Sequence, residues 1–320
     1  PSKGTGTAPG VGPSATGGAS ATGGSQAARQ PRHLPAPPDI RPIAANPLPH
    51  EGLWQTVGRT ADGIPTLRVA FLRPDPVHTS LVAGVAWMDT TLLRAALVAG
   101  TQVPGGSAWQ QGWGAEVPRS RRGSLVATFN SGFLLKDSHG GYYADGRTYA
   151  PLVPGGASVV VDRDGAITVG RWGVDVQMGP QVAFVRQNLQ LIVNHGRPVP
   201  GLATDSYQRW GATLGNAVMV WRSGLGVTTD GALVYAAGPG LSVQSLAAVL
   251  ARAGAVRAME LDINTDWVSF NYYTQNRSSS WGVAAHKLLS TMIRSQDRYL
   301  VPDERDFFAL SLRPRFAKTG

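Results

Sequence analysis

Short apolar segments, some alternating with polar residues and some continuous, begin near Glu51 and run through most of the chain. Because strand side chains point to the two faces in turn, such segments bounded by Gly, Pro and Asp-Gly turns predict strands. Asp164-Gly165 additionally predicts a hairpin. We expect strands at residues 66–72, 81–88, 125–129, 157–162, 166–170, 182–185, 189–193, 217–221, 226–228 and 232–237.

One helix is well marked. Ser242 supplies an N-cap oxygen, and Gly254 stands where a left-handed residue ends a helix. Between them an apolar stripe is formed by Val243, Leu246, Val249 and Leu250. A second helix is expected around residues 283–294. Since strands outnumber helices, the pattern predicts an α+β fold with a mixed, strand-rich sheet and a few helices packed outside it.

The first 47 residues lack this pattern. They consist mainly of Gly, Ser, Ala, Thr and Pro, with no acidic residue before Asp39. Such a segment cannot bury enough apolar surface to offset the entropy of ordering it. Residues 1–47 are therefore predicted to be a disordered linker, and residues 48–320 a single domain. An unstructured leader and a tether through a cell wall both fit this composition.

The net charge of the chain indicates which classes of binding partner to expect. The net charge is +9 and the pI about 10.2, which favours anionic partners such as nucleic acid, phosphate-bearing glycans or an acidic envelope surface. The Arg residues are scattered and no recognised nucleic-acid motif occurs, so we expect no nucleic-acid partner.

The chain has no Cys, which excludes disulfides and thiolate chemistry within it. It also has no run of 18 apolar residues, so it contains no predicted membrane span. Because it starts at Pro1, we expect that an upstream segment was trimmed, and that a signal peptide or membrane anchor could have been lost with it.

The segment after the first helix carries two carboxylates. Along a strand, Glu260 and Asp262 point to one face, while Met259, Leu261 and Ile263 point to the other. Like charges held this close raise at least one pKa, which suits acid/base chemistry or cation binding. A solvated outer face would give the same spacing.

Two polar stretches upstream are candidates for binding. The strand at residues 125–129 ends in Asn130, and Gly132 allows close backbone approach. The following loop holds His139, Asp145 and Arg147, although a lone loop His is more often not a ligand.

Further along, Asn216 precedes an apolar strand that ends in Arg222 and a Gly-rich turn. The Arg222 guanidinium could bind a phosphate or carboxylate bidentately, or form a structural salt bridge. Downstream of Asp262, the aromatic Trp267 could stack on a sugar face or pack in a small core.

The ordered set of motifs resembles the phosphodiester glycosidase domain family. Arg222 before a Gly turn, an Asp-Gly hairpin, a helix ending in Gly and the Leu261-Asp262 strand follow the family pattern. Upstream, the NSGF sequence that begins at Asn130 resembles the family's Asn-Gly-Gly-Phe signature. Asp262 carries over by motif, whereas Glu260 does not. The family follows its Leu-Asp with a Gly-rich loop, so residues 263–267 depart from it, and we expect substrate preference to reside there.

The resemblance implies an exported hydrolase that cleaves a sugar-1-phosphodiester in a cell-envelope or exopolysaccharide polymer. In this hypothesis Asp262 and Glu260 are the carboxylates, and His139 donates a proton. The predicted substrate-binding residues are Asn130, Arg222, Asn216, Asp145, Arg147 and Trp267. No cofactor is expected, although acidic residues 260, 262 and 266 are compatible with a divalent cation such as calcium. The alternative is a non-catalytic envelope protein that binds anionic glycans.

Overall fold

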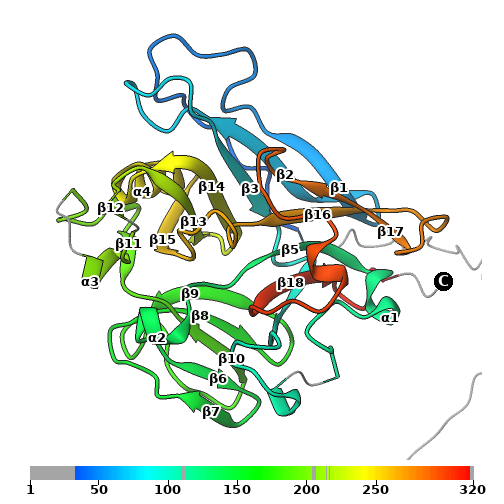
Figure 1. Ribbon diagram of the computed structural model, residues 1–320. Helices are drawn as coiled ribbons and strands as arrows, with labels where there is room; N and C mark the ends of the chain where they lie inside the picture. Colours follow the sequence, from blue (N-terminus) through cyan, green and yellow to red (C-terminus); the bar gives the residue numbers. More distant parts are fainter. Residues whose placement is uncertain (1–32, 110–111, 204–206, 214, 216, 318–320) are drawn as a thin grey trace, which may run out of the picture. The chain divides into compact units, whose positions relative to one another are not determined.

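The computed structural model describes residues 33–109, 112–203, 207–213, 215 and 217–317 (Figure 1). Residues 1–32 of the predicted linker lie outside this range. Residues 33–47 form no helix or strand, but Ile40 is 3% exposed and its N–H donates to the Gly52 carbonyl at 2.8 Å. The packed part of the chain therefore extends upstream of residue 48, because this Pro-rich segment adds apolar side chains to the core.

The largest sheet has eight strands in the order β1-β2-β3-β14-β13-β15-β11-β12, all antiparallel to their neighbours. Its strands are β1 (Gln55–Ala61), β2 (Ile64–Leu72), β3 (Ala83–Met88), β14 (Leu233–Leu241), β13 (Val220–Thr228), β15 (Ala255–Glu260), β11 (Leu191–Asn194) and β12 (Arg197–Pro198). Helix α4 (Val243–Arg252) packs on β13, β14 and β15 (Figure 1).

The ends of α4 follow the sequence prediction. Ser242 caps it in a reciprocal capping box with Ser245, and Gly254 beyond its end has a φ of +95°. The apolar stripe of the helix lies in a core cluster with Ala255 and Ala258 of β15.

Two further antiparallel sheets complete the fold. One has the order β7-β6-β10-β8-β9, and the other β17-β16-β5-β18-β4. Their strands are β7 (Arg147–Ala150), β6 (Tyr142–Ala144), β10 (Val182–Gln187), β8 (Ala157–Asp162), β9 (Ile167–Arg171), β17 (Val283–Lys287), β16 (Phe270–Gln275), β5 (Leu125–Asn130), β18 (Phe307–Leu312) and β4 (Leu93–Val98). Apolar side chains from all three sheets form one large core cluster, which includes Leu225, Phe129 and Val159.

The remaining helices are short. They are α1 (Arg119–Arg122), α2 (Leu135–Ser138) and α3 (Tyr207–Trp210), with 3-10 turns at η1 (Ser107–Trp109) and η3 (Arg298–Leu300). Within the described residues, no helix has the length and apolar character needed to cross a membrane.

The strand-rich α+β fold is confirmed, although among the described residues the ladders between strands are antiparallel and two isolated bridges are parallel. The second helix predicted around residues 283–294 is wrong. Val283 and Ala285 are buried while Ala284 and His286 are less so, a period of two, and the segment pairs with β16 as β17. Of the predicted strands at 217–221 and 226–228, residues 220–221 and 226–228 lie in the single strand β13, and residues 217–219 precede it. The two are joined because Gly224 and Gly226 lie in the ladder facing close neighbours.

Candidate functional site

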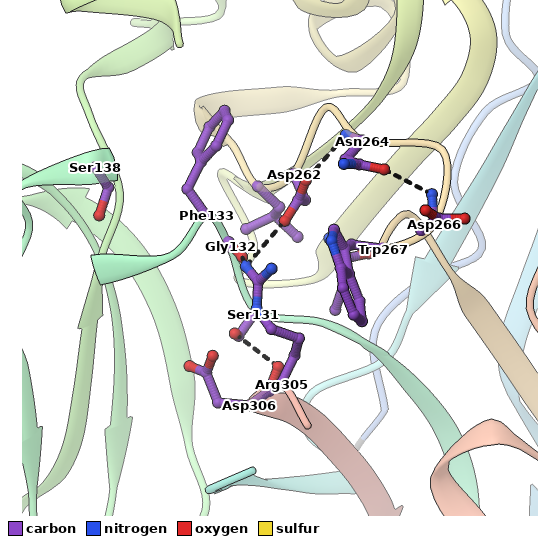
Figure 2. Close-up of polar contacts among 12 residues, drawn as sticks. Ser131, Gly132, Phe133, Ser138, Asp262, Asn264, Asp266, Trp267, Arg305 and Asp306 are labelled. Carbon is purple, nitrogen blue, oxygen red and sulfur yellow. Dashed lines mark hydrogen bonds and ion pairs between the residues drawn. The ribbon is translucent and has the colours of Figure 1, made fainter. Parts of the chain in front are cut away.

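Three strand ends meet at one place in the fold. β5 ends at Asn130, β15 ends at Glu260, and β18 begins at Phe307, whose register partner is Asn130. Asp262 lies two residues after the end of β15, and Arg305 two residues before the start of β18. Figure 2 shows that these two side chains face each other across the backbone of Gly132.

Asp262 is a buried carboxyl with few partners. It is 3% exposed, its Oδ2 accepts from Arg305 Nη2 at 3.1 Å, and its Oδ1 accepts from the Asn264 N–H at 2.9 Å. Burial raises the pKa of Asp262 to about 6, against the lowering effect of Arg305 and of backbone N–H groups. The side chain therefore exchanges a proton near neutral pH, which suits acid/base chemistry.

Arg305 connects this carboxyl to an aromatic ring. Its Nη2 also donates to the Gly132 carbonyl at 2.9 Å, and its guanidinium lies 4.9 Å from the ring centre of Trp267. Among the described residues, its buried Nε has no hydrogen-bond acceptor. A carboxyl, a cation with an unused donor and a partly exposed indole thus stand together (Figure 2).

The backbone after β5 is held rigidly beside this group. The Phe133 N–H donates to Asn188 Oδ1 at 3.2 Å, and the Phe133 carbonyl accepts from Arg186 Nη2. Asn188 Nδ2 also donates to the carbonyls of Glu260 and Leu261, at 2.6 and 2.7 Å. Asn188 therefore fixes the end of β15 relative to the Asn130–Phe133 segment.

The predicted binding residue Asn130 lies next to this site but is buried within it. Its Nδ2 donates to Ser223 Oγ at 3.0 Å, and its Oδ1 accepts from Tyr235 OH at 3.0 Å and from the Ser269 N–H at 3.2 Å. Ser223 Oγ in turn donates to the Asp262 carbonyl at 3.0 Å. Asn130 thus orients the backbone of Asp262, and its amide is already committed to protein partners.

Glu260 and Arg222 form an ion pair on the α4 side of the sheet. Arg222 Nη1 donates to Glu260 Oε1 at 2.5 Å, and Arg222 Nε donates to the Leu241 carbonyl at 2.8 Å. Glu260 is 0% exposed, and burial raises its pKa to about 7 although Arg222 lies beside it. Arg222 also lines a cavity of 840 Å³ with Trp210 and the first turn of α4, whereas Asp262 is not among the lining residues. Arg222 thus forms the salt bridge that was the alternative to binding a phosphate or carboxylate.

The other predicted residues are not brought to Asp262. His139 ends α2 in a left-handed conformation with an exposed side chain. Asp145 lies in the turn between β6 and β7, and the Arg147 guanidinium lies over Trp109 at 4.3 Å. No contact joins these three side chains to Asp262 in the described part of the chain. Asn216 lies outside the described residues.

The acidic residues do not gather into a cation site. Glu260 bonds Arg222, Asp262 bonds Arg305, and Asp266 is exposed. Nowhere in the described ranges do three or more His, Asp or Glu side chains lie as a metal site requires.

Sequence reasoning missed the arginines that surround Trp267. Arg294, Arg298 and Arg305 lie 4.6, 5.3 and 4.9 Å from its ring centre. The charged residues directly ahead of the apolar strand β18 were the available signal, in a chain with only 15% charged residues. The local sequence did not show that these arginines contact Trp267.

Comparisons with known proteins agree with the motifs. Residues 122–262 match the family model described as phosphodiester glycosidase. The catalytic domain of zebrafish N-acetylglucosamine-1-phosphodiester alpha-N-acetylglucosaminidase, auto-inhibited by its pro-peptide, is similar at 16% identity and a TM-score of 0.48, over 81% of this chain and 88% of that one. A hypothetical protein from Synechocystis is similar at 11% identity and a TM-score of 0.39, over 78% and 62% of the two chains. No curated protein matches the sequence. Residues 122–262 therefore match the phosphodiester glycosidase family model, in the region whose motifs carry the resemblance.

Proposed function

We propose that this protein is an exported hydrolase that cleaves the glycosidic bond of a sugar-1-phosphodiester in a cell-envelope or exopolysaccharide polymer. The family match supplies the reaction class. The net charge of +9 fits a polyanionic substrate, and the Gly- and Ser-rich first residues fit a tether in the envelope.

The observation that carries this proposal is the pairing of Asp262 with Arg305 beside Trp267. A sugar phosphodiester presents an apolar sugar face, an electrophilic C1 carbon and an anionic phosphate. An indole, a carboxylate and a guanidinium are the side chains that suit these three features.

The chemistry assigns Asp262 to the attacking side of the reaction. A phosphomonoester is a stable anion and leaves without being protonated, so the reaction needs help mainly with the incoming water. Water forms a bond to C1 as the bond from C1 to the phosphate oxygen breaks, and the electron pair leaves with the phosphate. The water proton passes to the ionised Asp262 carboxylate and then to solvent.

Glu260 has a different role in this scheme. Because it is fully buried, it contacts no substrate and acts through charge. Burial and the nearby Asp262 charge raise the pKa of Glu260, and Arg222 opposes both effects. His139 is not required, since the leaving phosphate needs no proton.

A panel of hexose 1-(methyl phosphate) diesters tests the proposal, with release of reducing sugar as the readout. The wild-type chain should turn over at least one member. Asp262→Asn should lower kcat by about 100-fold or more, while Asp62→Asn, a matched change at the exposed turn between β1 and β2, should leave it nearly unchanged. Glycan-phosphate binding without turnover on the whole panel would instead support the non-catalytic alternative.

A further inference from the structure

The three arginines around Trp267 are not equivalent. Arg298 is fully committed: its Nε and Nη2 donate to Asp303 at 2.6 and 3.1 Å, and its Nη1 donates to the Trp267 carbonyl and to Ser269 Oγ. Arg305 is balanced by the Asp262 carboxylate. Neither of these two cations adds an uncompensated charge to the site when both carboxylates are ionised.

Arg294 differs from both in its partners. Its Nε donates to the Asp266 carbonyl at 2.9 Å, and its guanidinium stacks 4.6 Å from the Trp267 ring centre. Within the described residues it has no ion-pair partner, and its two terminal nitrogens make no hydrogen bond. It is also partly exposed. One bond and one ring thus hold the plane of a guanidinium whose remaining edge is free.

Such an edge matches a phosphate group. Two parallel N–H donors of one guanidinium bind two oxygens of a tetrahedral anion, and prior orientation by the ring reduces the entropy lost on binding. Trp267 stands in the segment directly beyond the family match, which ends at Asp262.

We propose that Arg294, held on the Trp267 ring that Arg305 also contacts, binds the phosphate of the substrate and stabilises it as it leaves. The identification of the anion rests on the proposed function. In that reaction a phosphodiester with one negative charge becomes a phosphomonoester with two. A fixed cation therefore binds the departing group more tightly than the bound substrate, and this difference lowers the barrier.

The binding test does not need turnover. Methyl phosphate at pH 8, where it is mainly the dianion, is titrated calorimetrically into the full-length chain carrying Asp262→Asn. Adding Arg294→Ala should weaken binding by about 10-fold or more. Arg294→Lys should restore only part of it, because a lysine keeps the charge without the planar pair of donors. Arg277→Ala removes an exposed cation at the β16–β17 turn and should have no effect.

The kinetic test separates phosphate binding from a structural role. With a hexose 1-(methyl phosphate) substrate, Arg294→Ala should lower kcat/KM by about 10- to 100-fold, with kcat itself reduced. The proposal is overturned if the parent chain binds no methyl phosphate, or if Arg294→Ala and Arg277→Ala bind it equally. If methyl phosphate binding depends on Arg294 but no diester is hydrolysed, the proposed function fails and the anion site stands.

Discussion

Asn130 offers a sharp test of how the site is built, because its amide can serve either the protein or a sugar. Replacing it with Ala removes the acceptor for the Ser269 N–H and for the Tyr235 hydroxyl, and the donor to Ser223 Oγ. Tyr235 can turn to the Ser269 carbonyl, which is 3.3 Å away, and Ser223 keeps its bonds to Asp262. Only the Ser269 N–H loses its sole acceptor.

The expected cost follows from these partners. A buried N–H without an acceptor costs about 1–3 kcal/mol, and each of the other two lost hydrogen bonds about 1 kcal/mol. Asn130→Ala should therefore lower the free energy of unfolding by about 3–5 kcal/mol, measured by urea denaturation with an unchanged m-value. Asn276→Ala, at an exposed turn, is the control and should cost less than about 1 kcal/mol.

The reasoning would be refuted by a variant that keeps its stability. If Asn130→Ala unfolds at the same urea concentration as the wild type but releases no sugar, the amide serves the substrate and not the backbone of Asp262. A destabilised variant with near-normal kcat/KM at low temperature supports the structural role.

Three further predictions concern charge and capping. Because burial raises the pKa of Asp262 from 3.8 to about 6, the folded protein keeps a proton that the unfolded chain loses, and stability falls as pH rises through this window. The stability of the wild type relative to Asp262→Asn should therefore fall by about 2–3 kcal/mol between pH 4 and pH 8, and the wild-type kcat/KM should rise with pH through about 6. A stability difference that is the same at both pH values would contradict this. Arg186→Leu leaves the fully buried Asp306 without its cation and should cost about 3–5 kcal/mol in urea unfolding, so a loss below about 1 kcal/mol would argue against the pair. Ser242→Ala removes the capping box with Ser245 and should lower the free energy of unfolding by about 1 kcal/mol, measured by thermal unfolding. An unchanged melting temperature would mean that packing alone holds α4.

The strands and α4 could be predicted from sequence because their signals are local. The continuous, buried apolar run of β8 and the Ser242 and Gly254 signals of α4 depend on neighbours a few residues away. The segment at residues 283–294 failed for the same reason. Apolar residues at 284, 285, 288, 289, 292 and 293 have a spacing compatible with a helix, and pairing with β16 makes residues 283–287 a strand.

The residues of the candidate site also differ in whether their signals are local in sequence. Asp262 could be found from a motif and Trp267 from its neighbourhood, since both lie within one short segment. Arg305 and Arg294 reach this segment from about 30 or more residues downstream, through the pairing of β18 with β5 and the turn after β17. The polar composition of the loop after β5 suggested that its residues join the site, but it did not reveal that His139 and Arg147 lie apart from Asp262.

Hydrolysis in ¹⁸O-labelled water tests the central claim most directly, since it shows which bond the Asp262 site breaks. With a hexose 1-(methyl phosphate) that the wild-type chain turns over, mass spectrometry should find the label at C1 of the released sugar and none in methyl phosphate. Asp262→Asn should abolish this incorporation. Label in the phosphate product would mean that the P–O bond breaks, and would contradict a glycosidase acting through Asp262.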